Sequence, residues 1–446
     1  MKNIIIGTGP AGRLAGLELG KLDEDAILIE KKYIAGSCLN EGCMVTCALV
    51  DIGRFLNTKS RFENLGLLKG NIGVDYEVIT DKIKKTQEII RELDQKENES
   101  ANNQIIYGEA QINKNYVKVN GESFEYENLL IATGSRPFIP DIPGKENYLT
   151  NQDILKLKNI PDKVNVVGGG PIAAELSNIF SSFGSKVNII ARGKFLNNLD
   201  ADLREFTIKK LLNNVKIYEG YDIVEVKENK IIAKSNDKSK NTDEIKEFEG
   251  KSFAATGRIP NSEIAKDLVE LDKKGFIKVN EMMQTTKEGV YAAGDVIGGI
   301  NLTTVARIEG ITAARNMAGY LNKIEYNNIP QALTLDMDVG FTVNNNSKEL
   351  SKESSKDNEM SLAMTGSAGP GGFWRVLTKD TGLTKIKFDK NNHNLSEVSA
   401  ISPSAVSDVA YLSYLMRIGE NMKDIDEFIE IHPSTDIFHK LLKEVY

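Results

Sequence analysis

The sequence predicts an α/β protein with two Rossmann-like dinucleotide-binding domains. Two glycine-rich turns are the basis for this prediction, because each follows a short apolar strand and opens a helix. The first turn occupies residues 7–12 and the second residues 168–175. The chain of 446 residues is long enough for two to four domains.

The first turn has the residues that a dinucleotide pyrophosphate requires. Gly7 makes the turn, Gly9 lets the backbone approach the phosphates, and Gly12 permits close packing of helix and strand. Glu30 ends the second strand, where an acid can bind ribose hydroxyls. The expected contacts at this site are Gly7, Gly9, Pro10, Ala11, Gly12, Glu30, Lys31, Gly36 and Ser37.

The second turn repeats the pattern with an alanine, Ala173, in place of the third glycine. Its second strand ends in Arg192 and Lys194 rather than in an acid. A basic residue here suits the 2′-phosphate of NADP better than the free ribose of NAD, so we expect NADPH rather than NADH. An exposed arginine after a strand is the alternative. The expected contacts are Gly168, Gly170, Pro171, Ile172, Ala173, Arg192 and Lys194.

The composition excludes several classes of protein. The net charge of −7 argues weakly against nucleic acid as a partner. The sequence has no run of about 18 apolar residues, so we expect no membrane-spanning helix. An apolar strand at the N-terminus leads directly into the first glycine turn, so we expect no cleaved signal peptide.

The three cysteines of the chain, Cys38, Cys43 and Cys47, lie within ten residues of one another. A secreted disulfide scaffold would distribute more cysteines through a shorter chain. The cysteines and three histidines provide no second ligand pair for zinc, so we expect no metal site. These observations favour a cytoplasmic protein whose cysteines are chemically active.

Four further segments carry local predictions. Residues 83–93 read as part of a long surface helix, and residues 97–103 as a polar turn after it. Residues 236–246 are charged and resemble a hairpin tip, and residues 347–358 read as a polar loop or a frayed helix.

The only tryptophan, Trp374, ends a glycine-rich segment at residues 369–374. It could line a partner or substrate surface. We favour the alternative of a glycine-rich turn anchored by a buried aromatic side chain.

The cysteine pair next to the first turn indicates electron exchange between a flavin and a dithiol. Four more segments have matching motifs: residues 132–137, 255–261, 289–295 and 432–435. Together these motifs resemble the class I pyridine nucleotide-disulfide oxidoreductases, the flavoprotein family of dihydrolipoamide dehydrogenase, glutathione reductase and mercuric reductase. Residues 335–425 match this family only loosely.

This resemblance implies FAD at the first site, a C-terminal α+β dimerisation domain and a homodimer. It implies domains at residues 1–146 (first part of the FAD domain), 147–255 (NAD(P) domain), 256–325 (second part of the FAD domain) and 326–446 (interface domain). Asp295 would bind the ribityl chain of FAD. The further cofactor contacts implied are Thr133, Gly134, Arg136, Gly257, Arg258, Gly294 and Asp295.

In the family, a nicotinamide hydride reaches one face of FAD and the reduced flavin opens a disulfide on the other. By this resemblance, Cys43 would stack on the flavin and Cys38 would attack the substrate. His432 of the second subunit would hold or return the proton. The alternative for His432 is a capping or core histidine, and we expect His393 and His439 at the surface.

The chain departs from the family next to the flavin. Relatives carry a lysine soon after the second cysteine, whereas this chain has Met44–Cys47 without one. Glu175 stands where the partner of that lysine belongs, so burial without a cation should raise its pKa. The missing charge should also make the flavin harder to reduce. Cys47 is interpreted either as a third redox thiol or, by preference, as a small hydrophobic filler.

Two further departures concern the histidine and the nicotinamide pocket. The family's glutamate five residues after the histidine is Ile437 here, so Asp436 orients His432 or no carboxylate does. Pro171 replaces a mobile gate over the nicotinamide.

The leading hypothesis is an FAD-dependent NAD(P)H:disulfide oxidoreductase that acts on a small or carrier-bound disulfide. No cysteine follows Cys47, which argues against mercury as substrate and against thioredoxin reductases with a C-terminal dithiol. One alternative is a reductase of another electrophile, such as a metal ion, a quinone or an oxygen species. The other is an electron-transfer or redox-responsive flavoprotein that docks to a protein partner.

Overall fold

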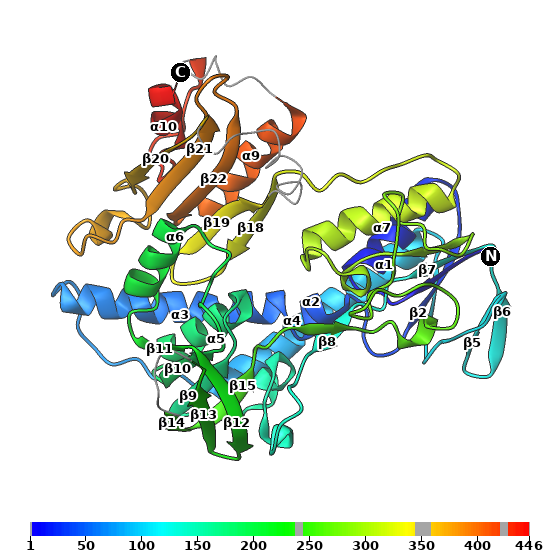
Figure 1. The fold of residues 1–446 in the computed structure, drawn as a ribbon, viewed down its shortest axis with the longest axis horizontal. Coiled ribbons are helices and arrows are strands. Elements are labelled where there is room, and N and C mark those ends of the chain that lie inside the picture. Colours follow the sequence, from blue (N-terminus) through cyan, green and yellow to red (C-terminus); the bar gives the residue numbers. More distant parts are fainter. Residues whose placement is uncertain (1, 237–243, 344–357, 420–426, 446) are drawn as a thin grey trace.

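The computed structural model describes residues 2–236, 244–343, 358–419 and 427–445. Figure 1 shows helix α3 (Cys43–Asn64) running from the first glycine turn's domain to a position beneath the C-terminal sheet. None of the helices in these residues is long and apolar enough to cross a membrane.

The first sheet has five parallel strands, and every residue of the first strand is buried. The strand order reverses at this first strand, so the glycine turn that follows it lies at the switch point where ligands bind in such sheets. In spatial order the strands are β17 (Val290–Ala292), β7 (Asn128–Ile131), β1 (Asn3–Ile6), β2 (Ala26–Glu30) and β3 (Gln104–Tyr107).

The second sheet has the same topology in four parallel strands. Helix α5 (Pro171–Ser182) follows its first strand and packs on the sheet. The strands are β11 (Val215–Glu219), β10 (Lys186–Ala191), β9 (Lys163–Val167) and β15 (Lys251–Ala254). The prediction of two Rossmann-like units is therefore confirmed.

The C-terminal region forms one antiparallel sheet of five strands with helices against it, which confirms an α+β domain. The domain boundaries given above stay predictions. The elements are β18 (Ile329–Leu333), β19 (Asp338–Val343), β22 (Leu395–Ser402), β21 (Leu383–Asp389), β20 (Glu359–Thr365), α9 (Ala405–Ile418) and α10 (Phe438–Val445).

Smaller elements complete the fold. Two antiparallel three-stranded sheets consist of β4 (Gln111–Ile112), β5 (Tyr116–Val119) and β6 (Glu122–Glu125), and of β12 (Tyr221–Lys227), β13 (Lys230–Ser235) and β14 (Ile245–Glu249). The remaining elements are α1 (Pro10–Lys21), α2 (Gly36–Asn40), α4 (Tyr76–Ser100), α6 (Ala201–Phe206), α7 (Thr303–Met317), β8 (Ser135–Pro137) and β16 (Arg258–Pro260).

Helix α4 confirms the helix expected at residues 83–93 and is longer. A polar turn beginning at residue 97 was the wrong expectation, because the helix continues to Ser100. Asn98 donates from its side-chain amide to the Asp94 carbonyl within the helix, and Glu97 pairs with Arg13 of α1. The expected polar stretches at 236–246 and 347–358 lie largely outside the described residues. Strands β13 and β14, which flank the stretch at 236–246, pair antiparallel.

Helices α1 and α7 approach closely because small residues face each other. A Cβ at Gly310 would lie 2.1 Å from the Ala11 carbonyl oxygen. We therefore expect Gly310→Ala to lower the free energy of unfolding by about 1–3 kcal/mol, seen as a lower urea midpoint. Gly73→Ala is the control, since a Cβ there meets nothing within 4 Å. Equal midpoints for the two variants would contradict this packing.

Candidate active site

The two cysteines of the expected redox pair lie on consecutive helices. Cys38 is in the short helix α2, and Cys43 is the first residue of α3. Helix α4 holds the connection, since Gln87 donates to the Leu39 carbonyl at 2.8 Å and Arg91 to Asn40 Oδ1 at 2.8 Å. These two contacts fix the residues between Cys38 and Cys43.

The first glycine turn brings this segment to the nucleotide site. A Cβ at Gly36 would lie 2.7 Å from Gly9 Cα, so the start of α2, including Ser37, packs directly on the turn. Gly36, at φ 58°, has no room for a Cβ, whereas a Cβ at Gly9 would meet Gly36 Cα at an ordinary 3.9 Å. The cysteine pair therefore folds back onto the first nucleotide site, as the sequence predicts.

Thr303, the first residue of α7, contacts both thiols. Its hydroxyl donates to Cys38 Sγ at 3.2 Å and lies 3.8 Å from Cys43 Sγ. Sequence analysis missed Thr303, because it is 265 residues from Cys38 and no spacing rule connects them.

The two thiols differ in acidity. A hydrogen bond from Cys43 lowers the pKa of Cys38 to about 6, against burial, which raises it; Thr303 and the charge of Arg307 lower it further. The pKa of Cys43 is raised, first because it donates that hydrogen bond and then by burial. Both cysteines are free thiols here, and Cys38 is the one that holds a thiolate at neutral pH.

Glu175, on α5, lies beside this pair without a cation. Among the described residues no lysine or arginine forms an ion pair with it, and its one hydrogen bond is from the Thr334 backbone N–H at 3.0 Å. Burial, followed by the charges of Cys43 and Asp338, raises its pKa to about 7 although the Thr334 N–H lowers it. The expected rise in the pKa of Glu175 is confirmed.

Cys47 lies one helical turn after Cys43 and is half-buried. Burial raises the pKa of its thiol, and the charges of Cys43 and Glu175 raise it further. Cys47 is therefore a neutral thiol at neutral pH. A neutral thiol fits the interpretation of Cys47 as a small apolar filler.

Cys47 also lines a cavity of about 420 Å³ between α3 and α4. The wall is mostly aliphatic, with Leu39 and Met44 at the end nearer the cysteine pair and Ile79, Ile83 and Ile90 from α4. The cavity offers an apolar surface to Cys47, and its lining includes the chain neighbours of Cys38 and Cys43.

The first nucleotide site fits a dinucleotide. The N-terminus of α1, at Gly9, Pro10 and Ala11, has no side-chain cap, which leaves its N–H groups for phosphate. Glu30 ends β2 and is held by the Thr8 N–H at 2.9 Å and the Lys32 N–H at 2.8 Å. Lys31, also expected here, is exposed and pairs with Glu109 at 2.5 Å.

The strands β8 and β16 pair antiparallel and bring the two expected hinge segments together. Arg258 donates to Ser135 Oγ at 2.6 Å, and this hydroxyl donates to Asp295 at 2.5 Å. Arg136 instead pairs with Glu263 at 2.6 Å. Other expected residues lie in the same connection: Thr133, which donates to the Asn261 carbonyl, Gly134 and Gly257.

Glu309 holds the Gly294–Asp295 segment against α1 and was not found from the sequence. It is buried, and its carboxylate accepts from the Gly294 N–H at 2.8 Å and from the Tyr326 hydroxyl at 2.8 Å. No sequence motif marks Glu309, because the helix around it mixes polar and apolar residues along its length.

The second nucleotide site is open. Gly170 begins α5 without a side-chain cap, and a Cβ there would meet nothing within 4 Å, whereas Gly168 closes against the Ala255 carbonyl. Pro171 and Ile172 are exposed at this helix start and Ala173 is buried. Arg192 and Lys194 are exposed just after β10, where the sequence analysis places them for a 2′-phosphate.

His432 is exposed on its own subunit, far in sequence from the cysteines. Asp436 does not orient it: one carboxylate oxygen accepts from the Tyr411 hydroxyl at 2.8 Å and the other from the Phe438 N–H at 2.8 Å, at the start of α10. The surface position expected for His439 is wrong, since it is buried and lies 2.7 Å from Glu430.

Comparison with known proteins agrees with this geometry. Residues 1–310 match the sequence model of the family described as pyridine nucleotide-disulphide oxidoreductase. A dihydrolipoyl dehydrogenase from Buchnera aphidicola subsp. Schizaphis graminum is 29% identical over 461 residues, covering 99% of this chain and 95% of that protein.

Two further relatives differ in coverage. A dihydrolipoyl dehydrogenase from Acholeplasma laidlawii is 33% identical over 329 residues, covering 70% of this chain and 95% of that protein. A mercuric reductase from Lysinibacillus sphaericus is 29% identical over 435 residues, covering 95% of this chain and 78% of that protein.

Proposed function

Since the chain belongs to the pyridine nucleotide-disulphide oxidoreductases, we propose that it exchanges electrons between NAD(P)H and a small or carrier-bound disulfide through Cys38 and Cys43. Enzymes of this family use FAD and a pyridine nucleotide. The observation that carries the proposal is the acidic Cys38 thiol, which shares hydrogen bonds with Cys43 and Thr303.

The cysteines perform the disulfide chemistry in two exchanges. The Cys38 thiolate attacks one substrate sulfur, forming a mixed disulfide and releasing the first substrate thiolate. Cys43 then loses its proton and attacks Cys38 Sγ, which releases the second substrate thiolate and leaves a Cys38–Cys43 disulfide. The first glycine turn and Asp295 would hold FAD, which would supply, from the nicotinamide, the two electrons that reduce this disulfide.

The protons need a donor near the substrate. We propose His432 of a second copy for this role, so that the active unit is a homodimer. Exposure of His432 on its own subunit supports the assignment. Asp436 acts indirectly, by fixing the start of α10 through Phe438.

The apolar cavity between α3 and α4 favours a substrate with an aliphatic part. Leu39, Met44 and Cys47 line it beside the cysteine pair, and its volume of about 420 Å³ accommodates a short alkyl chain. A lipoyl group, which the names of two relatives contain, has such an aliphatic chain.

We place the enzyme in the cytoplasm, because its three cysteines are confined to one reactive segment.

For the nucleotide we propose NADPH over NADH, because Arg192 and Lys194 follow β10 where an acid would bind a free ribose. The cofactor contacts proposed are those of the two glycine turns and of the β8–β16 connection. Arg192 and Lys194 are exposed, so their long side chains are free to extend to the 2′-phosphate.

An anaerobic titration of the FAD-loaded protein with NADPH, and separately with NADH, tests the proposal. We expect a long-wavelength band from thiolate-to-flavin charge transfer at two electrons per subunit, at lower concentrations of NADPH than of NADH. The reduced enzyme should then be reoxidised by lipoamide. Bleaching of the flavin without that band would contradict a working cysteine pair.

The unpaired carboxyl of Glu175 favours a second candidate function, electron transfer from the flavin to a non-disulfide acceptor or a docked protein partner. Without the cation the flavin should be a stronger reductant, which suits such acceptors. Quinone reduction that survives Cys38→Ser would support this candidate over disulfide reduction.

A further inference from the structure

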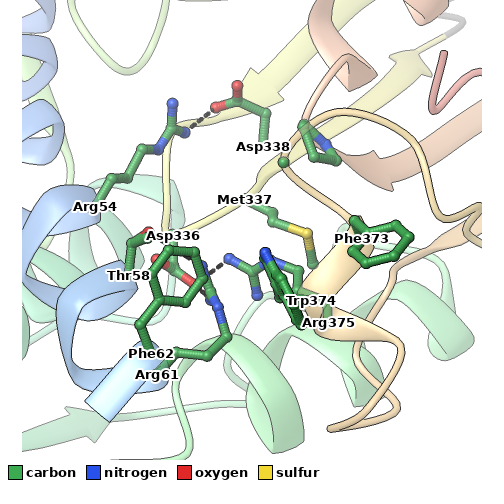
Figure 2. Close-up of a pocket in the computed structure, with 12 residues that line it drawn as sticks. Arg54, Thr58, Arg61, Phe62, Asp336, Met337, Asp338, Phe373, Trp374 and Arg375 are labelled. Carbon is green, nitrogen blue, oxygen red and sulfur yellow. Dashed lines mark hydrogen bonds and ion pairs between the residues drawn. The ribbon is translucent and has the colours of Figure 1, made fainter. Parts of the chain in front are cut away.

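The glycine-rich segment that ends at Trp374 is not anchored by a buried tryptophan. Trp374 is 39% exposed, so that expectation is wrong, whereas the next residue, Arg375, is only 4% exposed. Figure 2 shows the Arg375 guanidinium directed at Asp336, with the ion pair between them drawn as a dashed line. The buried anchor of this segment is therefore a charged side chain.

Arg375 joins the segment to the rest of the protein. Its two terminal nitrogens bind Asp336 at 2.6 Å and Asp380 at 3.1 Å. Its backbone N–H donates to the Gly372 carbonyl at 3.0 Å, and the Gly372 N–H donates to the Gly369 carbonyl at 2.9 Å. A buried charge is costly to separate from its carboxylate partners, so Arg375 holds this turn in one position.

The other end of the turn lies against the main chain that follows His432. The Ser367 hydroxyl donates to the Ser434 carbonyl at 3.0 Å. A Cβ at Gly369 would lie 2.2 Å from the same carbonyl oxygen, so the approach requires a glycine there. Ser434 is two residues after His432, and the turn therefore meets the backbone beside the histidine.

The imidazole of His432 depends on this backbone for its position. It is exposed, and its side chain forms no hydrogen bond or ion pair with the residues that the structure describes. Asp436 is bound elsewhere, as described above. Next to Ser434, the Thr435 hydroxyl lies 2.6 Å from Ser404 Oγ at the start of α9. The main chain after His432 is thus held between α9 and the turn, and these contacts set where the histidine is presented.

We propose that Ser367 is a positioning residue for His432. Its hydrogen bond to the Ser434 carbonyl holds the main chain so that the exposed imidazole projects toward the cysteine pair of a second copy. This inference rests on the proton-donor role proposed above for His432. The glycine-rich turn then sets the alignment of the histidine that each subunit supplies to the other, and Ser367 acts only through that histidine.

Ser367→Ala tests this role in the FAD-loaded protein. We expect kcat for NADPH-dependent lipoamide reduction to fall about tenfold, because a small displacement misaligns the proton donor. The rate at which NADPH bleaches the flavin should not change, since His432 takes no part in that step. Ser367→Thr keeps the hydroxyl and should restore most of the lost turnover. Ser396→Ala is the matched control and should leave both rates unchanged, because the hydroxyl it removes bonds Glu359 at 3.1 Å in the same domain.

A double variant shows whether Ser367 acts through the histidine. In a His432→Gln background, where the proton donor is already missing, Ser367→Ala should cost no further turnover. The inference about Ser367 would be overturned, while the role of His432 stands, by a loss that repeats in full in that background, that also slows flavin bleaching, or that Ser367→Thr does not restore. A parental rate of lipoamide reduction in Ser367→Ala would overturn it equally.

Failure of the proposed function gives a different result. Absence of lipoamide reduction by the parent protein, or full turnover by His432→Gln, would refute the proton-donor role itself. The inference about Ser367 would then fall with that role, whatever Ser367→Ala does.

Discussion

Cys38→Ser is expected to lower turnover with lipoamide by about a thousandfold or more, because an alcohol at neutral pH replaces the nucleophilic thiolate. Reduction of bound FAD by the nicotinamide should change little, since Cys38 takes no part in that step. Rapid-mixing measurement of flavin bleaching, beside steady-state turnover, separates the two effects.

Cys47→Ser is the matched control for this loss. Cys47 is a neutral thiol on the same helix as Cys43, and it needs no thiolate if it only fills space. We expect the serine variant to retain turnover within about threefold, in line with a small buried substitution. Comparable loss in both variants would mean that all three thiols form one redox unit. Undiminished turnover in Cys38→Ser would refute the proposed nucleophile.

Cys47→Lys is expected to raise the reduction potential of the bound flavin on the order of 30 mV, which for two electrons is about 1.4 kcal/mol. An ammonium group beside Glu175 would stabilise the negative charge that reduction adds. Cys47→Met is the control, since it extends the side chain without a charge. A redox titration that gives the same potential for the lysine and methionine variants would contradict the electrostatic cause.

The same variant should change the pH dependence of stability. Glu175 has a pKa of about 7 in the folded protein, above its ordinary value of 4.5. Between these values the folded protein keeps a proton that the unfolded chain has lost, so this group makes stability fall as the pH rises. A lysine at position 47 should lower the folded pKa and flatten the decline, which urea midpoints measured across that window would reveal.

The nucleotide-binding sheets were predictable because their signals are local. A glycine turn between a strand and a helix can be recognised within about a dozen consecutive residues. Thr303 and Glu309 were not predictable, because they reach the site from α7 only after the whole chain has folded. Their sequence neighbours reveal nothing of those contacts.

The details of the C-terminal domain also could not be predicted from local sequence. Its antiparallel sheet has no glycine fingerprint, and the burial of His439 depends on how α10 meets strands far away in sequence. Asp436 stands near His432 in sequence, yet its oxygens turn to Tyr411 and to the start of α10. The short distance in sequence between Asp436 and His432 therefore could not predict which groups the Asp436 carboxylate would bind.

The loss of a lysine after Cys43 has a practical consequence for mass spectrometry. No lysine or arginine occurs between Lys32 and Arg54, so trypsin releases residues 33–54 as one peptide that contains every cysteine of the chain. Alkylation before digestion then adds a countable mass for each free thiol to a single ion. The Cys47→Lys variant would split this peptide after residue 47, leaving Cys38 and Cys43 together on the first fragment.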